Sequence, residues 1–441
     1  MKGYIAELHE YYRTGEMFPT DVVTRHLKAA DTLGRELNAF TAILHEEALA
    51  AAEESQRRYQ NAAPLSPIDG VPISIKDLFH VKGTATGCGS HAYPADIQPR
   101  DADMVGQLKA AGAVIIAKNN LLEFAFGLVN PDIGPAHNPW DPAKTIGGSS
   151  SGSAAAVGAG MGLASIGTDT AGSVRNPAAL GGVVGFKPTY AHYSSEGLIP
   201  LSPSLDHIGI LTETVADAQA MFEALGGEHQ HDEKGKWRVA SVDLGYTSPD
   251  VQQVVDGLID KVLGTIAAPC PAFTFEWQSA NQAAIEIITA EAYAVHRDLL
   301  KERWDLYGEP TRVRLLAGQA VRAHEYIRAR QVRETLRRNW LAKTEEVDFI
   351  LLPTLPTVAV TEDEALAEDL STATLYTSTF ALLGLPAVSV PAGLGSHRLP
   401  VGLQIVGRPG RDAEVLAFAR LVEELRGPFP RPCCHIESTH E

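Results

Sequence analysis

One lysine and two glycine-rich, serine-bearing segments are the residues of this chain best suited to chemistry. Gly147 to Ser153 reads Gly-Gly-Ser-Ser-Ser-Gly-Ser, Gly167 to Arg175 reads Gly-Thr-Asp-Thr-Ala-Gly-Ser-Val-Arg, and Gly70 to Asp77 carries Lys76. A serine hydroxyl is a weak nucleophile until a base takes its proton, and lysine can replace histidine as that base. The three segments therefore indicate nucleophilic catalysis by serine without histidine.

Lys76 meets one condition for such a base. A lysine accepts a proton at neutral pH only when burial or nearby positive charge lowers its pKa. Lys76 directly follows the apolar run Val71 to Ile75, which we interpret as a short strand. We expect the lysine at the end of a buried strand.

The segment around Ser173 predicts a site for a developing oxyanion. The run Val174 to Leu180 can begin a helix, with Pro177 tolerated in its first turn. Backbone amides at such a helix start attract anions, and Ala171 and Gly172 are small enough for a carbonyl group to approach them. Losing one donor of an oxyanion hole costs roughly 10²–10³ in rate.

The serines at 149, 150, 151 and 153 compete for the intermediate role between Lys76 and Ser173. Gly148 to Gly152 also fits the nucleophile-elbow pattern G-x-S-x-G with Ser150 at its centre, which would require an Asp and a His downstream. Asp206 and His207 are adjacent, and we interpret them as core or turn residues. Gly147 to Ser153 could also be interpreted as a phosphate-binding loop, but the Gly-Lys-Ser/Thr ending of such loops is absent, which counts against that interpretation.

Other polar residues give weaker indications. Cys433, Cys434, His435 and His440 could bind a metal, but they lie in a polar tail that nothing in the sequence holds in place, and we expect no metal site. His229 and His231 lie in a proposed linker, Gly226 to Lys236, and are expected to be solvated. Tyr307 and Arg314 fall in a helix-rich region, where they could contact a substrate carboxylate or form a surface salt bridge.

Strand and helix patterns alternate around these segments, which predicts an α/β layered core with mainly parallel strands. The late strands match the early ones in length and apolarity, so they either join the same sheet, with the middle helices as an insertion, or form a second domain. The expected helices are 21–33, 46–59, 103–111, 121–126, one from about 153, 278–303, 312–341 and 412–425, and the expected strands are 71–75, 113–117, 164–167, 237–242, 349–352, 387–390 and 402–406.

Composition narrows the functional classes. The 441 residues carry a net charge of −17, which opposes nonspecific binding to nucleic acid or to an anionic membrane. The polar stretch Met1 to Thr14 is no signal peptide, and Ala154 to Ile166 is too short and weakly apolar to span a membrane. Four cysteines are too few for a disulfide scaffold. We therefore expect a cytoplasmic protein.

The combined segments resemble the amidase signature family, and the similarity extends over essentially the whole chain. The resemblance implies one α/β/α domain over residues 1–441, around a large mixed, twisted sheet, with the signature core at about 70–189 and a substrate-specificity region at about 278–342. It implies no metal or organic cofactor, and a homodimer is possible. The matching segments are Gly70 to Thr189, which includes Asn138-Pro139-Trp140 and Gly185-Phe-Lys-Pro-Thr189, and Leu399 to Arg408.

The resemblance also implies roles for individual residues. Lys76 matches the family's base, Ser149 the serine that follows a cis peptide bond, and Ser173 the nucleophile. The implied reaction cleaves a small-molecule carboxamide through an acyl-enzyme, releasing ammonia or an amine. The backbone amides of Thr170, Ala171, Gly172 and Ser173 match the oxyanion hole, and Ser150, Asp169 and Arg175 match supporting positions.

Two alternatives remain beside a small-molecule amidase. One is the glutaminase subunit of a tRNA-dependent amidotransferase, which resembles this chain along its whole length. Such subunits capture glutamine with an acidic residue shortly before the segment matching Leu382 to Pro386, whereas Leu370 to Ala381 contains no acid. The other is a binding module on a decayed scaffold, against which the presence of Lys76, Ser149 and Ser173 counts.

Overall fold

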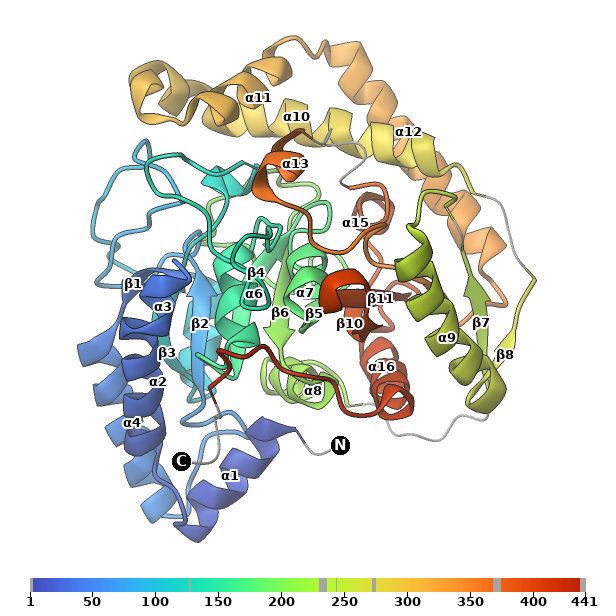
Figure 1. Cartoon of the computed structure of the whole chain (residues 1–441). Coiled ribbons are helices and arrows are strands. Elements are labelled where there is room, and N and C mark those ends of the chain that lie inside the picture. The colour runs from blue at the N-terminus through green and yellow to red at the C-terminus, as the bar shows by residue number, and fades with distance from the viewer. Residues whose placement is uncertain are drawn as a thin grey trace.

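A mixed β-sheet runs through the centre of the computed structural model, which describes residues 3–126, 128–229, 236–242, 244–271, 275–367 and 374–436. Within these residues the sheet has eleven strands in the order β1-β3-β2-β4-β6-β5-β10-β11-β9-β7-β8 (Figure 1). The strands are β1 Phe40–Ile43, β2 Pro72–Lys76, β3 Val114–Asn119, β4 Ala164–Asp169, β5 Val184–Lys187, β6 His207–Thr212, β7 Trp237–Ser241, β8 Ala267–Pro269, β9 Phe349–Pro353, β10 Ala387–Leu394 and β11 Pro400–Val406.

Early and late strands share this sheet. β10 pairs with β5 on one side and with β11 on the other, both antiparallel, and β9 connects β11 to β7. This agrees with the first of the two arrangements expected from the sequence, in which the late strands join the early ones.

Helices cover both faces of the sheet. Along β6, Ile208 and Ile210 pack in the core that contains α8 and α16, whereas the neighbouring Leu211 packs in the core that contains α6 and α7. Successive side chains of a strand point to opposite faces, so the two cores lie on opposite sides of the sheet. The expected α/β/α layering is confirmed.

The helices outside the middle region are α1 Tyr4–Thr14, α2 Pro19–Asp31, α3 Leu33–Glu36, α4 His45–Gln60, α5 Asp103–Ala110, α6 Ser151–Gly158, α7 Arg175–Gly181, α8 Val215–Ala224, α9 Pro249–Thr265, α13 Glu362–Ala367, α15 Ser378–Leu382 and α16 Asp412–Arg426, with 3₁₀ turns η1 Glu123–Ala125, η2 Trp304–Leu306 and η3 Ser396–Arg398.

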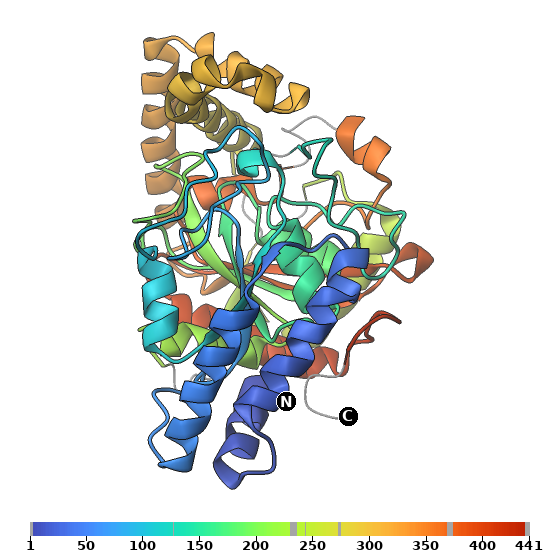
Figure 2. The same ribbon diagram turned by 90° about the vertical axis from the view of Figure 1, so that its left-hand side faces the viewer.

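The middle of the chain supplies α10 Trp277–Glu302, α11 Glu309–Gln319 and α12 Ala323–Lys343, which we call the helical cover. Figures 1 and 2 show the helical cover at the end of the molecule opposite α1. Both α11 and α12 pack against α10. None of the described helices is long and apolar enough to cross a membrane.

The helix expected at 121–126 is wrong. The chain forms only the short turn η1 there, and Phe124 and Ala125 have φ angles of 49° and 60°. The amide of Glu123 donates to Leu128 O and that of Phe124 to Cys88 O, so tertiary contacts take the donors that a helix would use. Of the expected linker, residues 230–235 with His231 lie outside the described residues, and His229 is exposed beside Glu223.

The expectation that nothing holds the C-terminal tail is also wrong. Arg431 and His435 both contact the carboxylate of Glu213, at 2.7 and 3.1 Å, and the amide of Ile436 donates to Ala159 O. Among the described residues no group of three or more His, Cys, Asp or Glu side chains could hold a metal ion. His440 lies outside those residues.

Candidate active site

Lys76 lies at the carboxyl end of β2, fully buried, and contacts hydroxyl groups. Its Nζ lies 2.7 Å from Ser149 Oγ, 3.1 Å from Ser150 Oγ and 2.8 Å from Thr168 Oγ1. β2 runs parallel to β4, so the ends of both strands, with Lys76 and Thr168, meet at the same edge of the sheet. Burial lowers the pKa of Lys76 to about 7, against the opposing charges of Asp206 and Asp169. A large neutral fraction is therefore present near pH 7.

Ser149 and Ser150 occupy the turn that leads into α6. The peptide bond between Gly148 and Ser149 is cis. The amide of Ser150 donates to Ser173 O at 3.1 Å, which ties this turn to the segment of the expected nucleophile. The Ser150 hydroxyl donates to Thr168 O at 3.2 Å, so this serine links Lys76 and β4.

Residues 170–173, which we call the Ser173 loop, require glycine at position 172. Gly172 has φ of 132°, and a Cβ there would lie 2.2 Å from Thr377 Oγ1. The Gly172 amide donates to Asp169 Oδ1 at 2.8 Å, so in this structure it already has a partner within the loop. The three other expected donors, Thr170, Ala171 and Ser173, do line the pocket.

A buried ion pair organises the Ser173 loop. Asp169 receives two hydrogen bonds from Arg175, Nε to Oδ2 at 2.9 Å and Nη2 to Oδ1 at 2.8 Å, and both side chains are fully buried. Arg175 Nη1 also donates to Gln404 Oε1 at 2.6 Å. Burial would raise the pKa of Asp169, but the charge and hydrogen bonds of Arg175 outweigh it and hold the pKa well below its usual range. Thr377 adds a brace, because its hydroxyl donates to Ala171 O at 2.5 Å.

The nucleophile elbow centred on Ser150 does not form. Asp206 accepts from Thr170 Oγ1 at 2.6 Å and from the amides of Leu201 and Ser202. His207 uses Nδ1 toward Leu205 O at 2.6 Å. Burial raises the pKa of Asp206 to about 6, although its hydrogen bonds lower it. Both residues are buried structural groups, as expected from the sequence.

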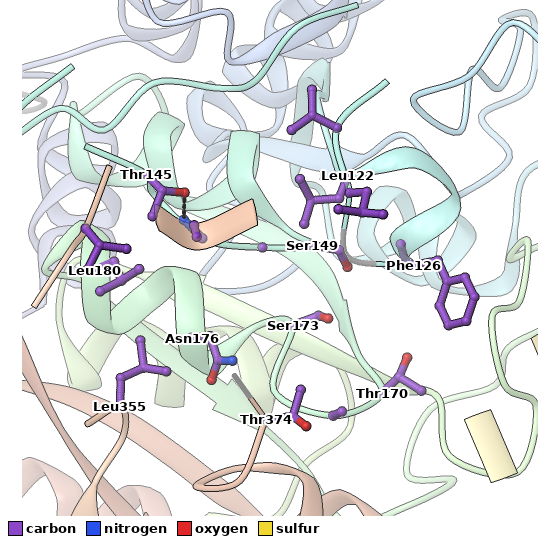
Figure 3. A pocket seen from close by; sticks show the side chains of 18 of the residues that line it. Leu122, Phe126, Thr145, Ser149, Thr170, Ser173, Asn176, Leu180, Leu355 and Thr374 are labelled. Atoms are coloured by element: carbon purple, nitrogen blue, oxygen red, sulfur yellow. Dashed lines mark hydrogen bonds between the residues drawn. The ribbon is translucent and has the colours of Figure 1, made fainter. Parts of the chain in front are cut away.

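A pocket of about 200 Å³ opens over the serines (Figure 3). Ser149 and Ser173 both line it, and its walls are mostly apolar. Several segments distant in sequence meet there. The lining residues are Leu122, Ala125, Phe126, Leu128 and Val129, Ile285 and Ile288 of α10, Arg314 of α11, Leu355, Pro356, Thr357, Val358, Val360, Glu362 and Ala365, and Thr374, among others.

The structure places only one of the two expected substrate-binding residues at the pocket. Arg314 lines the pocket, and its Nη1 donates to Phe126 O at 2.8 Å. Tyr307 is only 3% exposed and is not among the lining residues, so the structure does not bring it to the pocket with Arg314. Its ring stacks on Phe124 with centroids 5.1 Å apart, and its hydroxyl lies 3.0 Å from His296 Nδ1. Tyr307 packs the helical cover onto η1.

Glu123 joins the same two elements. It is fully buried and receives hydrogen bonds from the Ser90 hydroxyl, from Asn130 Nδ2 at 2.8 Å and from the Gly308 amide at 3.1 Å. Gly308 immediately precedes α11. The flanking Leu122 lines the pocket, and its amide donates to Ser149 O at 3.3 Å. η1 therefore connects α11 to the turn that carries Ser149.

Sequence reasoning missed several of these residues. Thr168 could have been found, because it precedes Asp169 on the strand beside Lys76. Thr377, Glu123 and Glu362 have no local signal, since their positions depend on contacts between segments far apart in the chain. Glu362, in α13, lines the pocket and lies outside the segment Leu370 to Ala381, in which an acid would be expected.

Comparisons with known proteins agree with this geometry. A family model described as Amidase matches residues 21–416. A glutamyl-tRNA(Gln) amidotransferase subunit from Anaeromyxobacter dehalogenans (strain 2CP-C) is 35% identical, with 94% of this chain and 94% of that protein covered. A crystal structure of an amidase superposes with a TM-score of 0.88 and 32% identity, over 96% of this chain and 99% of that one.

A peptide amidase from Stenotrophomonas maltophilia superposes with a TM-score of 0.82 and 25% identity, over 97% of this chain and 98% of that one. Because the family match covers most of the chain, the shared fold extends well beyond the serine segments. The chain belongs to the amidase signature family and is an amide-hydrolysing enzyme.

Proposed function

We propose that the enzyme cleaves a small-molecule carboxamide through an acyl-enzyme on Ser173. The Ser173 hydroxyl attacks the carbonyl carbon, its proton passes to Ser149, and the Ser149 proton passes to neutral Lys76. The contact of 2.7 Å between Lys76 Nζ and Ser149 Oγ is the observation that carries this proposal. The amides of Thr170, Ala171 and Ser173 would receive the developing oxyanion.

The same groups then act in reverse. Protonated Lys76 returns its proton through Ser149 to the leaving nitrogen, the C–N bond breaks, and the amine departs. Water then attacks the acyl-enzyme while its proton passes through Ser149 to Lys76. That proton returns through Ser149 to Ser173 Oγ as the acyl C–Oγ bond breaks and the carboxylic acid leaves. The described hydroxyl and amine groups carry every proton between Ser173, water and the leaving nitrogen, so these steps require no metal or organic cofactor.

The pocket suggests what the amide carries. Its walls are mostly apolar, and Arg314 projects from α11 into them. A guanidinium in apolar surroundings binds a carboxylate well, because it offers paired donors and a full charge. We propose that Arg314 binds an anionic group of the substrate.

Chemical trapping tests the proposed nucleophile. A fluorophosphonate should label Ser173 in the wild-type enzyme, and hydroxylamine should intercept the acyl-enzyme as a hydroxamate. Ser173→Ala should lose both signals, whereas Ser195→Ala, a change at an exposed serine, should keep them. A labelled Ser173→Ala protein, or hydrolysis that it still catalyses, would exclude this nucleophile.

A glutaminase subunit is the second candidate, favoured by the 35% identity to the amidotransferase subunit of Anaeromyxobacter dehalogenans. Arg314 would suit the glutamine carboxylate, but Thr374 lines the pocket in the segment where an acid was expected. A decayed binding module is disfavoured, because Lys76 and Ser149 are in contact. Ammonia release from glutamine, measured with and without partner subunits of such a complex, separates this candidate from a stand-alone amidase.

A further inference from the structure

Large apolar side chains are exposed together on one surface of the helical cover, which we call the outer surface of α11. Of the ten large apolar side chains that are exposed in the described part of the chain, five lie between positions 304 and 327 and are 37–63% exposed: Trp304, Leu306, Val313, Leu316 and Ile327. Figures 1 and 2 show α11 at the edge of the molecule. Exposed apolar patches of this kind mark interaction sites.

The helix α11 is apolar on two opposite sides. Its inner side packs on α10, with Leu315 and Gly318 buried, and a Cβ at position 318 would lie 2.2 Å from Thr289 O. The outer side carries exposed apolar residues at the spacing i, i+3, i+4 and i+7, namely Val313, Leu316, Ala317 and Ala320. The outward side of a surface helix is normally polar, and a helix that is apolar all round is normally buried. A partner is therefore expected on the outer side.

The two ends of the outer surface carry opposite charge. At the end that leads into α11, Glu302, Asp305 and Glu309 are exposed. At the other end, where the surface continues onto the first turns of α12, the exposed charges are Arg322 and Arg328. A second copy turned by a two-fold axis across α11 would bring the acidic end of each copy to the basic end of the other. The surface is thus complementary to itself.

A lipid surface suits these residues less well. Asp305 lies between the exposed apolar side chains of Trp304 and Leu306, so burying those two in a bilayer would draw a carboxylate in with them. Anionic headgroups would also repel the acidic end of the surface.

We propose that a second copy of this chain covers the outer surface, in a two-fold dimer whose α11 helices lie antiparallel. Leu316 and Val313 would lie at the centre of the interface, and the charged ends would form its rim. The pocket lies on the other side of the helix, where Arg314 lines it. The dimer is therefore independent of the serine mechanism proposed above.

Sedimentation velocity of the full chain at micromolar concentration tests the dimer. The wild type should sediment with twice the mass of one chain. Leu316→Glu should raise the dissociation constant of the dimer about a hundredfold or more, because the two-fold axis places the new charge in the interface twice. Leu65→Glu is the matched control, since Leu65 is 53% exposed and follows α4, outside the helical cover. It should leave the dimer intact.

Charge reversal tests the antiparallel pairing. The double variant Asp305→Arg, Glu309→Arg has two basic ends, and the double variant Arg322→Glu, Arg328→Glu has two acidic ends. Each alone should be mainly monomeric, because like charges meet at both ends. An equimolar mixture should form a mixed dimer, which native mass spectrometry identifies by its mass, and circular dichroism checks that each variant is folded.

Three results would overturn the proposal. They are a wild-type monomer at micromolar concentration, a dimer that Leu316→Glu leaves intact, and a mixture of the two charge-reversed variants that stays monomeric. Phosphatidylglycerol vesicles that bind the wild type but not Leu316→Glu would assign the surface to a lipid instead.

Discussion

The two sides of the pocket are built differently. On the sheet side, Lys76, Asp169 and Arg175 are fully buried at strand ends and a helix start, and each has several hydrogen-bond partners. On the opposite side, Arg314 and Glu362 are half-buried and come from helices outside the sheet. Under the proposed mechanism, the sheet side carries the reacting groups, whereas α11 and α13 form the wall that faces the substrate. Substitutions on the two sides should therefore change different kinetic constants.

Lys76→Ala should give the largest effect of the changes considered next. A general base contributes about 10²–10⁴-fold, so kcat should fall by that amount with KM little changed. As the proposed base, Lys76 would be protonated and inactive below its pKa of about 7, so kcat/KM should rise about tenfold per pH unit up to that value and then level off.

A second buried lysine provides the control for this pH profile. Burial also lowers the pKa of Lys187 to about 7, but it donates to the carbonyls of Leu385 and Pro188 and does not line the pocket. Lys187→Met should leave the midpoint of the profile in place. If Lys187→Met shifts the midpoint, the titrating group is Lys187 and not Lys76.

Asp169→Asn tests the buried ion pair on the sheet side. It leaves the Arg175 charge buried without its partner, so the free energy of unfolding should fall by about 3–5 kcal/mol, as measured by urea titration. The pair's contribution should be present above about pH 4, the ordinary pKa range of an aspartate, and decline as the pH falls below it.

Two further variants sharpen that result. Adding Arg175→Met to Asp169→Asn should recover much of the lost stability, because no buried charge remains. Glu196→Gln, which breaks an exposed pair with Arg100, should cost no more than about 1 kcal/mol. Equal losses in the free energy of unfolding for the buried and the exposed pair would contradict the expectation that burial makes the Asp169–Arg175 pair the more important one.

Glu123→Ala tests the joint between the two sides. Loss of its bond to the Gly308 amide should let α11 shift, so KM for a carboxylate-bearing amide should rise about tenfold, the cost of one to two lost hydrogen bonds. We expect kcat within about twofold of wild type and partial rescue by Glu123→Gln, with folding checked by circular dichroism. A fall in kcat without a rise in KM would show that η1 serves the Ser149 turn instead.

Thr377→Val should have the smallest effect. It removes the hydroxyl that donates to Ala171 O, so kcat should fall about two- to tenfold as the Ser173 loop loosens. Thr379→Val is the matched control, because the Thr379 hydroxyl is buried with no hydrogen-bond partner among the described residues. If both variants lower kcat equally, the hydrogen bond from Thr377 to Ala171 O does not stabilise the Ser173 loop.

The sequence predicts the sheet side well. The strand expected at 71–75 is β2, Pro72–Lys76, and the one at 164–167 is β4, Ala164–Asp169, because short apolar runs between glycines are fixed locally. The organisation as one domain stays a prediction, which the shared sheet supports. The roles of Lys76, Ser149 and Ser173 stay proposals as well.

The side of the pocket opposite the sheet, which carries Arg314 and Glu362, is harder to predict from sequence. Tyr307 and Arg314 lie seven residues apart in the same region, yet one packs on Phe124 and the other lines the pocket. Their local sequence does not distinguish them, since both lie in the same polar, helix-rich stretch. Glu362 enters the pocket because its wall is assembled from distant segments, which no local pattern encodes.

The bond from Gly308 to Glu123 has a consequence for how this enzyme can diverge. Its donor is main-chain, and every residue except proline supplies such an N–H, so the attachment places no demand on the identity of the α11 side chains. A Cβ at position 308 would lie 2.8 Å from Glu123 Oε2, so glycine is what keeps the attachment close. Mutation can therefore change the side chains of α11 while a single small residue preserves the attachment of the helix.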